Sequence, residues 1–161
     1  MRDLDVARHF TNAATAVLYT MAGMDIIPGK FFIKHDRKVL GDITATMDVT
    51  GDKYGTIAVS FPRKSAMVLV HCMLGGDAAA HHMEQDMLDA VGEVMNMISG
   101  RARATISEAG ITLRTLTPHV MAGSDIEIEY KAEAAVVVIP FAERAGKTGM
   151  TFVVEFCLSD E

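Results

Sequence analysis

The spacing of hydrophobic residues changes along this 161-residue chain, and the change constrains the fold more than any other feature. Apolar residues recur at helical spacing over residues 3–21 and again in a long stretch that ends near Glu108. Between these stretches, from Gly41 onward, the period becomes two, and a second alternating segment covers residues 55–61 after a turn at 51–52. The pattern predicts an antiparallel hairpin combined with amphipathic helices, which is typical of an α+β fold.

Shorter segments complete this prediction. A middle helix opens at Pro62, where a missing N–H is harmless, and it ends at Gly75-Gly76. Asp77 fits the cap of the long helix that follows. Strands are expected at residues 31–33, 43–49, 55–61, 111–116, 134–139 and 149–158. We therefore expect a single domain over residues 1–161, with an antiparallel sheet of about six strands packed with about three helices.

Composition excludes several classes of function. The net charge is −6, with no basic stripe or tail that would favour nucleic acid as a partner. No apolar run approaches the roughly 20 residues that cross a bilayer. The first five residues include acids where a signal peptide would carry basic charge, so a cytoplasmic protein is expected. The two cysteines, Cys72 and Cys157, are too few for a disulfide framework and are expected to be buried.

The long helical stretch has two different faces. One face is apolar and consists of Val91, Val94, Met95, Ile98 and Ala102. The opposite face carries Asp89, Glu93, Asn96, Gly100 and Arg103. Glycine in a helix interior costs about 1 kcal/mol relative to alanine, and asparagine is also unfavourable there. The simplest interpretation is a solvated face, but such residues also fit a face that is presented to a partner.

Small residues favour the second interpretation. Gly92, Ser99 and Gly100 are expected on the polar side, so that Glu93 and Asn96 project from a low surface that a partner can approach. A carboxylate can hold a cation, while a carboxamide can both donate to and accept from a water molecule. Together they can position a water against an electrophile without a covalent intermediate.

Other candidate sites are weaker. His71-Cys72 and His81-His82 are adjacent pairs, and adjacent residues on a helix point about 100° apart, so neither pair chelates a metal from one face. Cys157 lies near the end of a strand and has no local signature of a catalytic thiol. The glycines at 51 and 75–76 lack the phosphate-binding spacing of a P-loop and are interpreted as turns.

The stretch around Glu93 and Asn96 resembles the signature of the CheC/CheX/FliY phosphatase family of bacterial chemotaxis. It reads Asp89-Ala90-Val91-Gly92-Glu93-Val94-Met95-Asn96-Met97-Ile98-Ser99-Gly100. Three further stretches resemble the same family, so the likeness spans nearly the whole chain. They are Pro28-Gly29-Lys30, residues 55–61 ahead of a helix that ends Met73-Leu74-Gly75-Gly76, and residues 116–123.

The resemblance implies an activity. Family members dephosphorylate the aspartyl phosphate of the response regulator CheY, and only Glu93 and Asn96 satisfy the family's Glu-x-x-Asn motif here. In the family, the asparagine enters the regulator's active site and holds the attacking water, and the glutamate pairs with the regulator's active-site lysine. The regulator supplies the Mg²⁺ and the phosphorylated aspartate, so no metal or other cofactor is expected in this chain.

The number of motifs implies a subtype. CheC-type and FliY-type members usually carry two motifs, whereas the first helix here has no glutamate three residues before Asn12. A single motif resembles CheX, and CheX-like proteins are dimers, so a homodimer is expected. Residues 136–139 are apolar on both faces of their strand, which indicates either a central strand or an edge covered by the partner.

The leading hypothesis is therefore an aspartyl-phosphate phosphatase whose water is oriented by Asn96 and whose partner lysine is held by Glu93. Asp89, Met97, Gly100 and Arg103 are the expected partner contacts on the same helix. The rival hypothesis is a non-catalytic receiver-binding adaptor or flagellar switch-type module on the same fold. The intact motif favours the enzyme.

Overall fold

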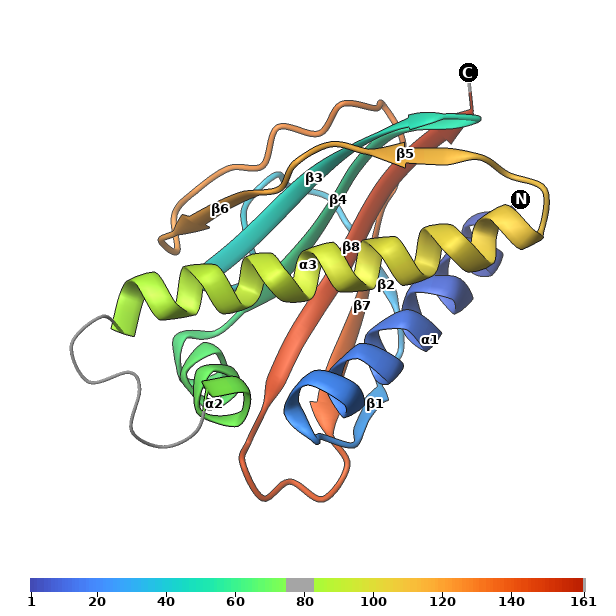
Figure 1. Ribbon diagram of the computed structural model, residues 1–161. Coiled ribbons are helices and arrows are strands. Elements are labelled where there is room, and N and C mark those ends of the chain that lie inside the picture. The colour runs from blue at the N-terminus through green and yellow to red at the C-terminus, as the bar shows by residue number, and fades with distance from the viewer. Residues whose placement is uncertain (75–82, 161) are drawn as a thin grey trace.

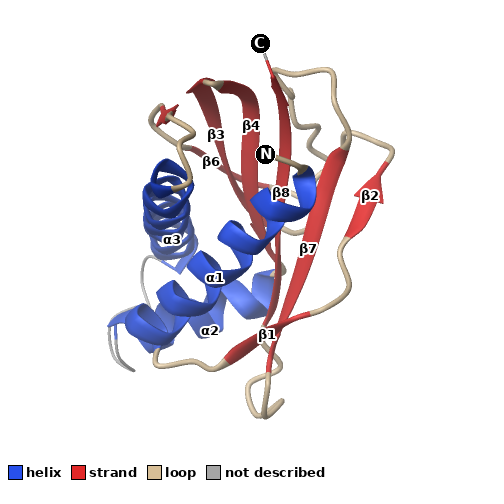
Figure 2. Ribbon diagram, turned by 90° about the vertical axis from the view of Figure 1, so that its right-hand side faces the viewer, coloured by secondary structure: helices blue, strands red, loops and turns tan. Residues whose placement is uncertain are grey.

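The computed structural model describes residues 1–74 and 83–160. In this part of the chain three helices lie against one face of an antiparallel sheet (Figures 1 and 2). The helices are α1 (Asp3–Ala22), α2 (Arg63–Leu74) and α3 (Met83–Glu108). The strands are β1 (Ile26–Pro28), β2 (Phe32–Lys34), β3 (Ile43–Gly51), β4 (Lys53–Phe61), β5 (Leu113–Thr115), β6 (His119–Ala122), β7 (Val136–Glu143) and β8 (Thr151–Asp160). None of the described helices combines the length and apolar character needed to span a membrane.

The α+β class and the antiparallel sheet predicted from the sequence are confirmed. The strand order is β1-β7-β8-β4-β3-β5, with β2 also paired to β7 and β6 also paired to β3. The sheet has eight strands rather than about six, because the sequence pattern did not predict β1 and β6. These strands have only three and four residues, too few for an alternating pattern to be visible. After the interruption at Pro118 the chain returns to the same edge of β3, where His119 lies opposite Thr46.

The main core lies between the helices and the inner face of the sheet. The apolar stripe predicted for α1 is buried, except that Met21 is only partly covered. The ring of Phe10 stacks on that of Phe156, with 5.6 Å between the ring centroids. The five apolar residues predicted on the inner face of the long helix are completely buried. These contacts fix which face of α3 remains available for function.

The strand that the sequence showed to be apolar on both faces, β7, is a central strand of the sheet rather than an edge strand. β7 pairs with β8 on one side and with β1 and β2 on the other. Val137 and Ile139 belong to the main core, while Val136 and Val138 pack on the outer face in a smaller cluster with Ala132 and Cys157. The interpretation of this strand as a partner-covered edge is therefore wrong, because the chain covers it with its own residues.

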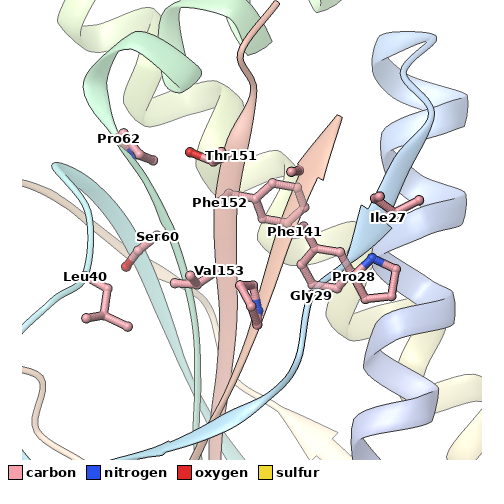
Figure 3. A pocket seen from close by; sticks show the side chains of 12 residues that line it. Ile27, Pro28, Gly29, Leu40, Ser60, Pro62, Phe141, Thr151, Phe152 and Val153 are labelled. Carbon is pink, nitrogen blue, oxygen red and sulfur yellow. The ribbon is translucent and has the colours of Figure 1, made fainter. Parts of the chain in front are cut away.

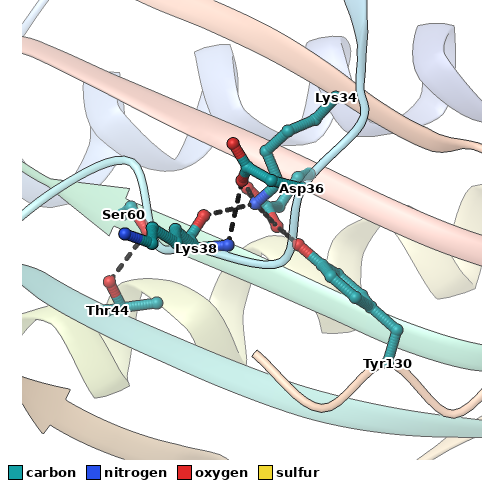
Figure 4. A network of polar contacts seen from close by, with 7 residues as sticks. Lys34, Asp36, Lys38, Thr44, Ser60 and Tyr130 are labelled. Atoms are coloured by element: carbon teal, nitrogen blue, oxygen red, sulfur yellow. Dashed lines mark hydrogen bonds and ion pairs between the residues drawn. The ribbon is translucent and has the colours of Figure 1, made fainter. Parts of the chain in front are cut away.

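A buried ionic network fastens irregular segments to the outer face of the sheet (Figure 4). The Lys34 ammonium donates to both carboxylate oxygens of Glu155, at 3.0 and 3.2 Å, and to the Lys38 carbonyl oxygen at 2.7 Å. The Tyr130 hydroxyl also donates to Glu155. Burial and the neighbouring carboxylate raise the pKa of Tyr130 well above its usual range, so the phenol remains a donor.

This network buries a carboxylate on the outer face of the sheet. Glu155 lies on the outer face of the sheet, on the opposite side of β8 from the main core, yet its exposed fraction is 0%. The side chains that cover it come from β2 and from Tyr130, both distant in the sequence. The pattern correctly separated two faces of β8, but it could not show that both are covered.

The segment between α2 and α3 carries several sequence predictions that the structure does not test. The predicted helix end at Gly75-Gly76, the cap assigned to Asp77, and His81 and His82 lie outside the described residues. The described part of α2 begins at Arg63, directly after Pro62. The Ala66 amide donates to the Pro62 carbonyl at 2.9 Å, which is the first turn that the proline was expected to open.

Candidate functional site

The site is built on one long helix. α3 has 26 residues, which corresponds to about 39 Å of helix, and it crosses the helical layer beside β5 and β6 (Figure 1). Its inner side is anchored along its whole length in the core. The buried residues are Met87, Ala90, Val91, Gly92, Val94, Met95, Ile98, Ser99, Ala102 and Ile106. An outer side chain is therefore held on a rigid support rather than on a loop.

Glu93 and Asn96 both lie on the exposed side of this helix. A separation of three residues places them about one turn apart on neighbouring positions of the surface. In the described part of the chain, neither side chain forms an ion pair or a hydrogen bond with another residue. The Ser99 hydroxyl donates to the main-chain carbonyl oxygen of Asn96 at 3.1 Å and leaves the Asn96 carboxamide unengaged. Both functional groups are thus available to a partner.

The other predicted contact residues occupy different environments. Asp89 and Arg103 are exposed, and the Gln85 amide donates to Asp89 at 2.8 Å. Gly100 is half-buried. Met97 is also half-buried and packs against the main core, so only part of its side chain can meet a partner.

The expectation that Gly92, Ser99 and Gly100 share one low outer surface is wrong for the first two. Gly92 and Ser99 are buried. A Cβ added at Gly92 would lie 3.0 Å from Cγ2 of Val120, so this glycine lets β6 pack closely against α3. A Cβ added at Gly100 would meet no atom of the described residues within 4 Å. Of the three small residues, only Gly100 contributes to a low outer surface.

Two hollows border the outer side of α3. One is lined by Met73 and Leu74 from α2 and by Asp86, Asp89, Ala90 and Glu93 from α3. The second is lined by Gly100, Arg103, Ala104, Ser107, Thr112 and Leu113. Sequence reasoning did not single out Ala104, Ser107 or Thr112. Helical spacing from Gly100 by four and seven residues is the signal that could have identified the first two.

The other groups considered from the sequence remain separate from this surface. Cys157 is buried on the outer face of the sheet, as expected from the sequence. Its thiol donates to the carbonyl oxygens of Ala132 and Ala134. Burial raises the pKa of this thiol. Cys72 is exposed, although the sequence suggested a buried residue. Within residues 1–74 and 83–160, no three His, Cys, Asp or Glu side chains are grouped so that they could hold a metal ion.

Comparison with known proteins agrees with the sequence resemblance. The family model described as "Chemotaxis phosphatase CheX" matches residues 43–142, a range that begins at β3 and includes all of α3. The CheY-P phosphatase CheX of Thermotoga maritima is 26% identical over 87 residues, which are 54% of this chain and 56% of that protein. The chain thus aligns with a little more than half of that relative.

Solved structures extend the similarity to almost the whole fold. A chemotaxis protein CheX from Desulfovibrio desulfuricans has 42% identity and a TM-score of 0.85, with 96% of this chain and 99% of that chain covered. A structure of the CheX-CheY-BeF₃-Mg²⁺ complex from Borrelia burgdorferi matches with a TM-score of 0.78 over 97% of this chain and 99% of the matched chain. Its 19% identity shows a common fold.

Proposed function

Because the chain belongs to the CheX family of chemotaxis phosphatases, we propose that it hydrolyses the aspartyl phosphate of a CheY-type response regulator. The observation that carries this proposal is the pair Glu93 and Asn96, which stands exposed on a rigid helix without intrachain partners in the described structure. The Thermotoga relative, a CheY-P phosphatase, and the Borrelia complex of CheX with CheY support the same class of substrate.

Asn96 is proposed to orient the attacking water. Its carboxamide oxygen can accept a hydrogen bond from the water while its NH₂ group donates to a phosphoryl oxygen. The water oxygen attacks phosphorus, the bond between phosphorus and the aspartate oxygen breaks, and inorganic phosphate and a free carboxylate are released. The contribution of Asn96 is positioning, which requires no covalent bond to this chain.

Glu93 is proposed to hold the partner. Its carboxylate pairs with the active-site lysine of the regulator, which brings the phosphoryl group to Asn96 one turn away. The regulator brings its own Mg²⁺ and phosphorylated aspartate, so the chain needs no metal for this reaction. Asp89, Met97, Gly100 and Arg103 are proposed to complete the contact surface, with Met97 contributing only its uncovered part.

We also propose that the chain forms a homodimer, through a different surface from the one suggested by the sequence. Val138 cannot contact a partner because its exposed fraction is 0%. The better candidate is β2, which pairs with β7 along one edge and whose other edge pairs with no strand of the described chain. Phe31, Phe32 and Ile33 there are large exposed apolar residues. An open apolar strand edge is a template for pairing with a second copy.

An apolar groove lies beside β1, which pairs with the same edge of β7 as β2 does (Figure 3). Pro28, Leu40 and Pro140 are among the residues that line it. The groove and the β2 edge together provide an apolar surface remote from the outer side of α3. Dimerisation there would leave Glu93 and Asn96 accessible in both copies.

The test is phosphate release from a phosphorylated CheY-type receiver with Mg²⁺. Asn96→Ala should lower the rate about a hundredfold or more, because it removes a group that positions the water. Its matched control is Asn12→Ala, an exposed asparagine on α1 that lacks a glutamate three residues before it. The control should keep the wild-type rate, and both variants should keep the wild-type melting temperature.

Glu93→Ala should weaken affinity for a receiver loaded with Mg²⁺ and beryllofluoride and should lower catalytic efficiency in parallel. Asn96→Ala should leave that affinity nearly unchanged. Wild-type turnover by Asn96→Ala would remove this residue from the mechanism. Binding by the wild-type protein without acceleration of phosphate release would favour the adaptor instead.

A further inference from the structure

The hollow beside the C-terminal half of α3 is lined by a charged residue, Arg103, that forms no ion pair within the described part of the chain. Arg103 is exposed and lines this hollow of about 260 Å³ together with Gly100, Ala104 and Ser107 of the same helix. Thr112 and Leu113, at the start of β5, form its other side. In the described part of the chain Arg103 belongs to none of the ion pairs. Its guanidinium group can therefore serve a partner without breaking an internal contact.

Stabilisation of the helix does not explain Arg103. A positive charge stabilises a helix mainly when it lies within the last turn. The last turn of α3 contains no basic residue, and the helix ends five residues beyond Arg103, at Glu108. The macrodipole therefore accounts for little of its presence.

Arg103 lies on the same side of the helix as the proposed catalytic asparagine. It follows Asn96 by seven residues, which corresponds to two turns, about 10 Å along the axis and a rotation of only about 20°. Arg101 is also exposed, but a separation of five residues turns it about 140° away from Asn96. The two arginines have the same chemistry and nearly the same position along the helix, and they differ in the side that they face.

Gly100 makes the approach to this hollow unobstructed. It lies one turn beyond Asn96, and a Cβ there would contact nothing within 4 Å in residues 1–74 and 83–160. Packing within the chain therefore does not require glycine at this position. The absence of a side chain lowers the surface between Asn96 and Arg103, where a docked molecule would have to come close.

We propose that this hollow is a second contact site, in which Arg103 pairs with an acidic side chain on the surface of the receiver. The inference rests on the proposed function, because it takes the receiver docked at Glu93 and Asn96 as given. A domain of only about 100 residues has a radius of gyration of about 13 Å, so a receiver centred near Asn96 reaches Arg103. The planar guanidinium can hold a carboxylate through two parallel hydrogen bonds.

The consequence is a fixed docking direction. A basic group of the receiver meets Glu93, and an acidic group meets Arg103 about 15 Å further along the same helix. A receiver turned end for end would place like charges together at both positions, which opposes binding. Arg103 would therefore select among receivers by the charge that they carry beside the phosphorylation site.

Charge reversal tests this assignment. Arg103→Glu should weaken binding of a receiver loaded with Mg²⁺ and beryllofluoride by tenfold or more, and in turnover the loss should appear mainly in KM. Arg101→Glu is the matched control, since it changes the net charge equally on the same helix, and it should alter binding less than twofold. Arg103→Gln should give a smaller loss than reversal and serves as the second variant if reversal affects folding.

A complementary change provides the stronger test. Single Asp→Arg and Glu→Arg variants of the receiver should include one that restores binding to Arg103→Glu and weakens binding to the wild-type chain. Equal losses for Arg101→Glu and Arg103→Glu, or no loss for either, would overturn the second site. A failure of the proposed function itself would appear separately, as wild-type protein that releases no phosphate from the receiver.

Discussion

The two glycines on α3 should respond in opposite ways to the same substitution. Gly92 and Gly100 both lie in the interior of the helix, where alanine is favoured over glycine by about 0.5–1 kcal/mol. At Gly100 a new Cβ meets no atom within 4 Å in the part of the chain that the structure describes, so the full gain should be retained. We expect Gly100→Ala to stabilise the isolated protein by about 0.5–1 kcal/mol. For a chain of this size, the melting temperature should rise by about 1–4 °C.

At Gly92 the same gain is opposed by a contact. The new Cβ would lie 3.0 Å from Val120 Cγ2, so β6 or the valine side chain must move by a few tenths of an ångström. Overpacking of this kind typically costs about 1–3 kcal/mol. The net change is therefore a destabilisation between about zero and 2.5 kcal/mol. Gly92→Ala should therefore melt at the wild-type temperature or below it.

Urea unfolding of a double-mutant cycle isolates the cause. Gly92→Ala should become more favourable by about 1 kcal/mol when it is made in a Val120→Ala background, because the obstructing methyl groups are then absent. Gly100→Ala should have the same effect in both backgrounds. A lower melting temperature for Gly100→Ala, or no coupling between Gly92 and Val120, would refute this reasoning.

Gly100→Ala also separates stability from function. If the glycine keeps the surface low for a receiver, the substitution should raise KM for phosphate release while it raises the melting temperature. A side chain that stabilises the free protein but weakens docking would show that Gly100 is retained for the partner. An unchanged KM would mean that the receiver does not approach this turn closely.

Three further predictions concern the outer face of the sheet. Lys34→Met should destabilise the protein by about 3–5 kcal/mol in urea unfolding, because it leaves Glu155 buried without its cation. The double variant Lys34→Met/Glu155→Leu should recover part of the loss. Equal stability of the single and the double variant would contradict the network. Val138→Lys should unfold the chain rather than produce a folded monomer, because it places an unpaired charge in the cluster with Ala132, and a folded variant by circular dichroism would be inconsistent with this packing. Light scattering should give twice the 17.4 kDa chain mass, and Phe32→Glu on the open edge of β2 should halve it, whereas a monomeric wild type would exclude the dimer.

The parts of the fold that follow local rules could be predicted from the sequence. The hairpin of β3 and β4 and the two long helices have many repeats of one period, and each repeat adds to the signal. Burial of Glu155 has no comparable signal. It depends on Lys34, 121 residues away in the chain, and on Tyr130, 25 residues away. Periodicity describes the faces of one element and contains no information on what later covers them.

The difference between local and distant contacts also explains the predictions for α3. Its exposed face was interpreted correctly, whereas the burial of Gly92 and Ser99 was not. Glu93, Asn96 and Arg103 have no side-chain partner in the described chain, so their spacing alone places them on a common surface. The sequence alone does not distinguish Gly92 from Gly100, because glycine is unfavourable at either position in the interior of a helix. Only the position of Val120 on β6 shows that the fold itself requires Gly92. Packing within the fold does not explain Gly100 and its exposed neighbours on α3. We therefore expect these residues to be explained by contact with a partner.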